Sequence, residues 1–150
     1  MIRHVTFAVG LVCLAGFAAA APAPKVAPKD DKADLKKLEG DWAIESWTQF
    51  GAPVGANWTW TIKGDKYTLD QGTNLEEGTL KLDPKKEPAV MDLEITGGNC
   101  KGKDQPGIYK LEGDTLTLCF GWPGTTERPT EFRSTAENRW ILITLKRAKK

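Results

Sequence analysis

The chain has 150 residues, which is enough for one domain of ordinary size and leaves no room for a second hydrophobic core. Its 21 basic and 20 acidic residues nearly balance. This balance excludes a protein that holds nucleic acid or an anionic membrane surface by charge alone.

Residues 1–20 have the pattern of a secretory signal peptide. Arg3 and His4 precede an apolar run over residues 5–17, and three alanines then offer a cleavage site. The run is too short for a transmembrane helix. We therefore expect a secreted or periplasmic protein of the cell envelope, with no stable membrane anchor after cleavage near Ala20.

Cleavage at this site would change the chemistry available to the chain. It removes Arg3 from the 21 basic residues, which leaves 20 of each sign, and it removes His4, the only histidine. A chain without histidine has no Ser-His-Asp or Cys-His nucleophile system and no imidazole ligand for a metal or haem. We therefore expect a protein that is not an enzyme and that holds no metal or cofactor.

The next segment leads into the folded domain. Residues 21–34 are rich in Pro, Ala and Lys and predict a flexible linker. One short helical turn fits Asp34 to Leu38, with Asp34 as its cap and Gly40 after its end. A polar lead-in that docks Leu35 and Leu38 on the domain fits this stretch equally well.

From residue 41 the apolar residues recur with the period of two that is typical of strands. Trp42 and Ile44 begin a first strand, which places Trp47 on the opposite face. Further strands are predicted over residues 78–82, 89–96, 130–134 and 140–145. A polar loop over residues 97–105 and a Gly- and Pro-rich loop over residues 121–129 separate some of them.

Two Gly-Asp pairs predict tight β-hairpin turns, at Gly64-Asp65 within residues 57–70 and at Gly113-Asp114 within residues 106–120. The second turn predicts a register that places most large apolar side chains on one face. The expected cross-strand pairs are Leu111 with Leu116, Tyr109 with Leu118, Gly107 with Phe120, Ile62 with Tyr67, and Trp60 with Leu69.

Nine short strands and no long helix indicate an all-β antiparallel sandwich or closed barrel. Adjacent hairpins favour the barrel, because closure leaves no exposed strand edge. We assign the domain to residues 35–147 and a solvated basic tail to residues 148–150.

Several motifs together resemble an uncharacterised lipocalin-like domain family that is abundant in planctomycete-type bacteria. The resemblance covers about residues 35–147 and implies a small antiparallel lipocalin-like β-barrel of about 8–10 short strands, with no catalytic residues to transfer. The motifs are Leu38-Glu39-Gly40-Asp41-Trp42, Gly64-Asp65-Lys66-Tyr67-Thr68, Gly78-Thr79-Leu80-Lys81-Leu82-Asp83-Pro84, Gly107-Ile108-Tyr109-Lys110-Leu111, Gly113-Asp114-Thr115-Leu116 and Arg128-Pro129-Thr130-Glu131-Phe132.

The Gly40-x-Trp42 pattern is similar to the first strand of true lipocalins, where the tryptophan packs beneath a basic residue near the end of the barrel. The resemblance implies that Arg147 or Arg139 takes that place here.

Aromatic side chains on the hairpins are the candidate binding site, because aromatic linings are typical of pockets in barrels. A hollow barrel would bind a small apolar ligand. The alternative is that the rings fill the core, and the monomeric protein then serves as an envelope interaction or structural module. The predicted lining residues are Trp58, Trp60, Tyr67, Tyr109 and Phe120.

Paired carboxylates offer a third and less favoured function, acid–base catalysis. The pairs are Glu76 with Glu77 and Asp92 with Glu94. Both pairs are predicted to face solvent, where nothing would raise the pKa of a carboxyl group.

The sequence contains three cysteines. Cys13 lies in the apolar leader run, and Val12 stands where a lipidation signal needs a small residue. Cys100 and Cys119 would remain after export to an oxidising compartment, so we predict a disulfide between them. Two unlinked thiols are the alternative, because Cys100 must fold back from its loop to reach Cys119.

Overall fold

The computed structural model describes residues 31–55 and 57–149. The predicted signal peptide and residues 21–30 of the predicted linker lie outside the described residues. The elements in chain order are α1 (Asp31–Leu38), β1 (Gly40–Gln49), β2 (Ala52–Pro53), β3 (Thr59–Lys63), β4 (Lys66–Asp70), β5 (Leu75–Asp83), β6 (Ala89–Gly97), β7 (Asp104–Glu112), β8 (Thr115–Phe120) and β9 (Ile141–Arg147).

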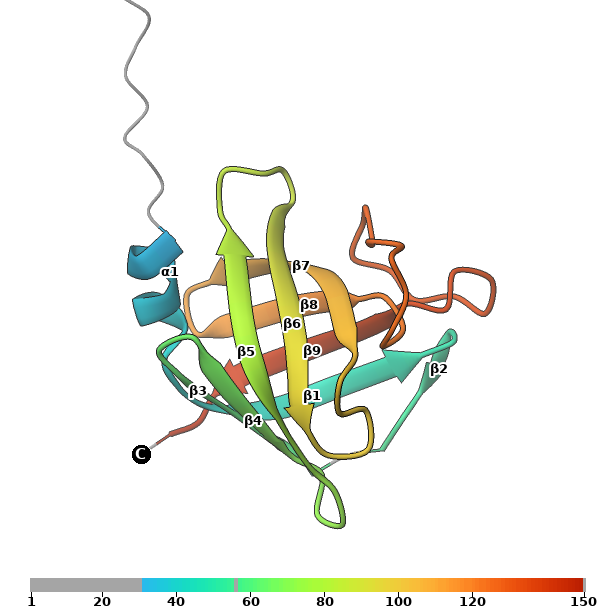
Figure 1. The fold of residues 1–150 in the computed structure, drawn as a ribbon, viewed down its shortest axis with the longest axis horizontal. Helices are drawn as coiled ribbons and strands as arrows, with labels where there is room; N and C mark the ends of the chain where they lie inside the picture. The colour runs from blue at the N-terminus through green and yellow to red at the C-terminus, as the bar shows by residue number, and fades with distance from the viewer. Residues whose placement is uncertain (1–30, 56, 150) are drawn as a thin grey trace, which may run out of the picture.

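The strands form one closed antiparallel barrel of the lipocalin-like type (Figure 1). Consecutive strands from β3 to β9 are neighbours, β3 pairs with β1, and β9 pairs with β1 to close an eight-stranded ring. The two-residue strand β2 adds to the far end of β1 only. The predicted all-β barrel is therefore confirmed.

Both predicted hairpins have the predicted register. Leu111 pairs with Leu116 and Ile62 pairs with Tyr67, around turns at Gly113 and Gly64. Each of these glycines has a φ of 60°, which suits the first central residue of a type II′ turn. The alternation within β7 and β8 thus directs one face of the hairpin into the barrel.

Strand β1 contains a β-bulge that changes the predicted facing of its side chains. The register with β9 shifts between Ile44 and Ser46. The extra residue brings Trp47 back to the inside, so Trp42 and Trp47 are both buried. The prediction that Trp47 lies on the face opposite Trp42 is therefore wrong.

The predicted strand over residues 130–134 is absent from the described part of the chain, because β8 pairs directly with β9 and leaves no free edge. This segment belongs to the loop between β8 and β9, which crosses the outside of the barrel. Arg128 fastens the loop through an ion pair with Asp92 and a hydrogen bond of 2.9 Å to the carbonyl oxygen of Gly107. Phe132 packs with Trp140 in a small apolar cluster beneath it.

The N-terminal helix is longer than predicted and covers one end of the barrel. α1 begins at Asp31, so residues 31–34 of the predicted linker are helical, and it ends at Leu38, which is buried. No helix in the described ranges has both the length and the apolar character needed to cross a membrane.

Candidate functional site

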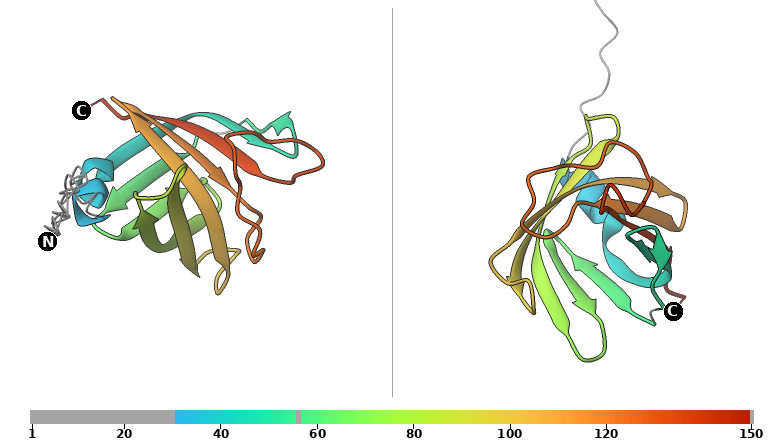
Figure 2. Two further views of the ribbon diagram at one scale, coloured as in Figure 1. Left: turned by 90° about the horizontal axis from the view of Figure 1, so that it is seen from above. Right: turned by 90° about the vertical axis from the view of Figure 1, so that its right-hand side faces the viewer.

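The two ends of the barrel differ in what covers them (Figures 1 and 2). The turns of the β3–β4 and β7–β8 hairpins lie at the end that α1 covers, which we call the helix end. The loops at residues 71–74, 98–103 and 121–140 lie at the opposite end, which we call the open end. In the right-hand view of Figure 2, the loop between β8 and β9 lies in front of the strands.

At the helix end, buried side chains are covered by hydrogen bonds and a cation–π contact. Leu38 and Trp42 are both buried, and the indole Nε1–H of Trp42 donates a hydrogen bond of 2.8 Å to the carbonyl oxygen of Leu38. The Arg147 guanidinium lies 4.3 Å from the centre of the Trp42 ring. It also donates hydrogen bonds of 2.8 Å to the carbonyl oxygens of Lys37 and Glu39.

Of the two arginines considered for this place, Arg147 is the one that covers the tryptophan. Arg139 lies in the loop between β8 and β9, at the open end. The arrangement ties the last strand to the segment that leads from α1 into β1, and Trp42 is fully buried beneath it.

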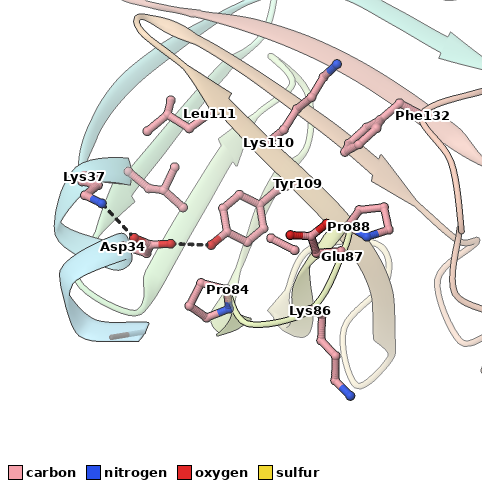
Figure 3. A pocket seen from close by; sticks show the side chains of 12 residues that line it. Asp34, Lys37, Pro84, Lys86, Glu87, Pro88, Tyr109, Lys110, Leu111 and Phe132 are labelled. Carbon is pink, nitrogen blue, oxygen red and sulfur yellow. Dashed lines mark hydrogen bonds and ion pairs between the residues drawn. The ribbon is translucent and has the colours of Figure 1, made fainter. Parts of the chain in front are cut away.

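A groove of about 680 Å³ lies at the helix end, between α1, the loop after β5 and strand β7 (Figure 3). Tyr109 points into it, and its hydroxyl donates a hydrogen bond of 3.0 Å to Asp34. Lys37 also contacts Asp34, at 3.1 Å. Burial, together with the hydrogen bond to Asp34, raises the pKa of Tyr109, so the hydroxyl is a fixed neutral donor that anchors α1.

A second cavity, of about 180 Å³, lies inside the open end, and we call it the open-end pocket. Aromatic rings form much of its wall. Trp47 and Trp58 form an edge-to-face pair, with ring centroids 4.9 Å apart and ring planes at 81° to each other. Trp60 and Phe120 also line the pocket, with nearly parallel ring planes and centroids 6.0 Å apart. The aromatic members of the lining are Trp47, Trp58, Trp60, Phe120 and Trp122.

Glycines opposite two aromatic rings make room for this wall. Gly107 pairs with Phe120, and a β-carbon at Gly107 would collide with the Phe120 ring. Gly78 pairs with Tyr67 in the same way, and a β-carbon there would lie 2.7 Å from Cε1 of that ring. Tyr67 in turn stacks on Trp60 at 5.1 Å, so the cross-strand pairs fix the positions of the rings.

Glu76 places a carboxylate in the open-end pocket. The residue is only 9% exposed, and its Oε1 accepts a hydrogen bond of 2.9 Å from the hydroxyl of Tyr67. Burial raises the pKa of Glu76, and the hydrogen bond from Tyr67 opposes that rise. The pKa of Tyr67 is also raised, by burial and by the adjacent carboxylate, so the tyrosine stays protonated.

The remaining polar lining is made of side-chain amides and one thiol, and none of the residues that line the open-end pocket is a lysine or an arginine. The Gln105 amide is held in place by a hydrogen bond of 2.9 Å to the carbonyl oxygen of Gly121. Asn74 is fixed by a hydrogen bond of 2.6 Å to Gln71. The pocket therefore combines aromatic walls, neutral hydrogen-bonding groups and one carboxylate. The other polar lining residues are Gln49, Asn99 and Cys100.

The five predicted lining residues do not all meet at one site. Trp58, Trp60 and Phe120 line the open-end pocket. Tyr67 is buried behind Trp60 and supports it. Tyr109 lies at the helix end, where it faces Asp34 instead of the pocket. Tyr109 was misplaced because cross-strand pairing identifies the inward face of a hairpin but does not identify the height of a residue along the barrel.

The predicted disulfide is absent: Cys100 and Cys119 are both free. Cys100 lines the open-end pocket, whereas Cys119 is buried outside the barrel wall with Ile108 and Trp140. The two thiols therefore lie on opposite sides of the sheet. Burial raises the pKa of Cys119 to about 11.

The rim of the open end exposes large apolar side chains. Phe50 is 41% exposed, Trp122 is 43% exposed and Leu75 is 51% exposed, and all three follow or precede loops at this end. The rings of Phe50 and Trp122 contact each other, with centroids 5.2 Å apart. Their exposure distinguishes this end of the barrel from the covered helix end.

Most of the pocket lining was not predicted from the sequence, and two of these residues, Trp47 and Glu76, shape the site most. Trp47 was missed because the β-bulge after Ile44 cannot be read from alternation. Glu76 was predicted to face solvent, and that prediction is wrong. Its burial could have been found, since β5 begins at Leu75, and the alternation that buries Leu80 also directs Glu76 inward.

Comparison with protein-family models, with curated proteins and with solved structures gave no match. Within the described residues, no group of three or more His, Cys, Asp or Glu side chains is arranged to hold a metal ion. The fold and the geometry of its two ends therefore carry the functional argument.

Proposed function

We propose that this exported lipocalin-like protein binds one small molecule in the open-end pocket. The observation that supports the proposal most strongly is the difference between the two ends of the barrel. One end is covered by α1 and Arg147, and the polar groups of its groove pair with one another, while the other end keeps a cavity lined by aromatic rings around a buried carboxylate. Cavities with aromatic walls and a few placed polar groups are the usual form of a ligand site.

The volume limits the ligand to a compact molecule. The pocket measures about 180 Å³, and Trp60 in its wall and Met91 in the barrel core are both fully buried. Typical ligand pockets measure roughly 300–1,000 Å³, whereas a cavity of about 150 Å³ accepts benzene. A small ligand with apolar surface fits this space, and a long acyl chain does not.

Binding is a better account of the site than catalysis. A cysteine nucleophile such as Cys100 needs a base to activate it, and the only histidine of the chain is His4, in the predicted signal peptide. Glu76 is the single carboxylate of the lining and has no second carboxyl group opposite it for paired acid–base work.

Ligand-observed NMR with a set of benzene-sized compounds tests the proposal. Trp58→Leu should abolish binding of any hit, because the half-buried Trp58 forms one wall of the pocket. Phe132→Leu is the matched control, since Phe132 is also a half-buried aromatic residue but lies outside the barrel. Binding that survives in Trp58→Leu, or equal losses in both variants, would contradict the proposed site.

A second candidate function is docking of an envelope protein on the rim. The exposed ring pair of Phe50 and Trp122 favours it, because contiguous exposed apolar groups are typical of interaction surfaces. A photo-reactive residue in place of Phe50 should then form a discrete crosslink in cells, and one in place of Lys63 on the helix end should not. If the two positions give the same products, the rim is not a specific interface.

A further inference from the structure

We propose that the ligand of the open-end pocket is a small organic cation of the alkylammonium type, held against the aromatic walls by the Glu76 carboxylate. This inference rests on the proposed function, since it names the chemical class of the molecule that the pocket binds. Three features carry it: the charge of the lining, the second carboxylate oxygen and the aromatic wall.

The first feature is the charge of the lining. Glu76 is its only carboxylate, and no lysine or arginine among the lining residues balances it. The other titratable side chains at this place are the Tyr67 hydroxyl from β4, which is hydrogen-bonded to Glu76, and the Cys100 thiol from the loop after β6, which lines the same pocket. Neither carries a positive charge in any protonation state, so an ionised Glu76 has no cationic partner in the described part of the chain.

The second feature is the incomplete pairing of the carboxylate. Tyr67 occupies Oε1, and within the described residues no donor reaches the second oxygen, although the residue is nine-tenths buried. That oxygen is also not among the side-chain atoms that are completely enclosed without a partner. Because Glu76 lines the open-end pocket, we place this accessible oxygen toward the pocket, where a bound cation would supply the missing charge.

The third feature is the aromatic wall. Ring faces attract cations, tryptophan most strongly, and cages of aromatic residues are the common solution for quaternary ammonium groups. The perpendicular rings of Trp47 and Trp58 and the parallel rings of Trp60 and Phe120 surround one pocket with the Glu76 carboxylate. Tetramethylammonium is about the size of benzene, which suits the volume of about 180 Å³.

A neutral ligand that accepts hydrogen bonds is the competing class. The indole N–H groups of Trp47 and Trp60 have no hydrogen-bond partner in the described structure, but both nitrogen atoms are completely buried. With the tryptophan side chains in these positions, a molecule in the pocket does not reach the two indole nitrogen atoms. The carboxylate is reachable and these donors are not, which favours the cation.

Isothermal titration calorimetry of the protein with choline and with its uncharged carbon isostere, 3,3-dimethylbutan-1-ol, separates the two classes. We expect choline to bind about tenfold more tightly or better at about pH 8, the ratio that about 1.4 kcal/mol of added attraction produces. Its affinity should fall as pH decreases through the raised pKa of Glu76, because protonation removes the charge that holds it.

Two variants assign the effect to the pocket. Glu76→Gln keeps the acceptor for Tyr67 and should lower the choline-to-isostere ratio clearly, leaving only the preference that the aromatic wall supplies. Glu77→Gln removes the same charge from the adjacent exposed residue and should leave the ratio unchanged. Thermal unfolding and the NMR spectrum of each variant confirm that it is folded, and Trp58→Leu gives an independent loss of choline binding.

The outcomes separate this inference from the proposed function. Equal or tighter binding of the isostere, or no binding of choline, overturns the cationic ligand. A neutral compound that then binds in the NMR set and is lost in Trp58→Leu leaves the pocket as a ligand site of another class. An unchanged choline affinity in Glu76→Gln likewise overturns the role of the carboxylate.

Discussion

Arg147→Met tests what closes the helix end of the barrel. The substitution keeps an unbranched side chain over Trp42 but removes the charge and every donor. The guanidinium is lost from its position 4.3 Å from the Trp42 ring, and the carbonyl oxygens of Lys37 and Glu39 lose their donor. α1 and the start of β1 are then no longer tied to the end of β9.

The contacts that Arg147→Met removes give the size of the expected loss of stability. Each hydrogen bond from a charged donor contributes about 1.5–3 kcal/mol, and the cation–π contact adds about 0.5–1 kcal/mol. The Arg147 side chain is 33% exposed, so water replaces part of this loss, and its ion pair with the 82% exposed Asp114 adds almost nothing. We therefore expect the free energy of unfolding to fall by about 2–4 kcal/mol.

Urea unfolding monitored by tryptophan fluorescence measures this loss. With a denaturant slope of about 2 kcal/mol per molar, the midpoint should fall by about 1–2 M. Arg139→Met is the matched control, and a change within about 0.5 kcal/mol is expected because Arg139 is an exposed loop residue. Equal midpoints for Arg147→Met and the unaltered protein, or equal losses in both variants, would refute the closure of this end by Arg147.

Three further predictions concern the carboxylate, a turn and the thiols. Burial raises the pKa of Glu76 above its ordinary 4.5, so the ionised form of the carboxyl group opposes folding. Glu76→Gln should therefore become more stable relative to the unaltered protein as pH rises above 4.5, which urea titrations at several pH values measure. Gly113→Val should cost about 1 kcal/mol or more of unfolding free energy through its φ of 60°, and no loss would contradict the turn. Thiol titration should find two free cysteines per folded chain. Cys119 should react far more slowly than Cys100, because burial raises its pKa to about 11, and equal rates would place Cys119 outside the buried cluster.

The sequence predicted the parts of the fold that depend on local chemistry. A Gly-Asp turn and strict alternation determine a hairpin within about fifteen residues, which is why the pairs around Gly64 and Gly113 are confirmed. Because consecutive strands joined by hairpins lie side by side, the order of the strands from β3 to β9 follows the order of the chain. The resemblance of Gly40-x-Trp42 to the first strand of lipocalins also narrowed the basic partner of Trp42 to two arginines, of which Arg147 takes that place.

The failures share a physical origin in contacts between distant segments. Residues 130–134 alternate like a strand, but a strand needs a partner edge, and β8 and β9 already pair with each other. Cys100 and Cys119 are close in sequence, yet the sheet lies between their side chains. A bulge in β1 returned Trp47 to the interior, and only the pairing with β9 reveals it.

The distribution of unsatisfied polar groups argues that the open end, and not the helix end, carries the function. At the helix end the buried donors of Trp42 and Tyr109 each have an acceptor. At the open end the indole groups of Trp47 and Trp60 have none in the described structure, and Glu76 is paired at one oxygen only. A barrel that served only to be stable would gain from apolar residues in place of these groups, since burying each of them opposes folding. Departures from a fully satisfied interior are typical of functional sites. In the described residues the unpartnered indole N–H of Trp140 lies in the outer cluster, whereas the other departures lie around the cavity that enters the barrel from its uncovered end.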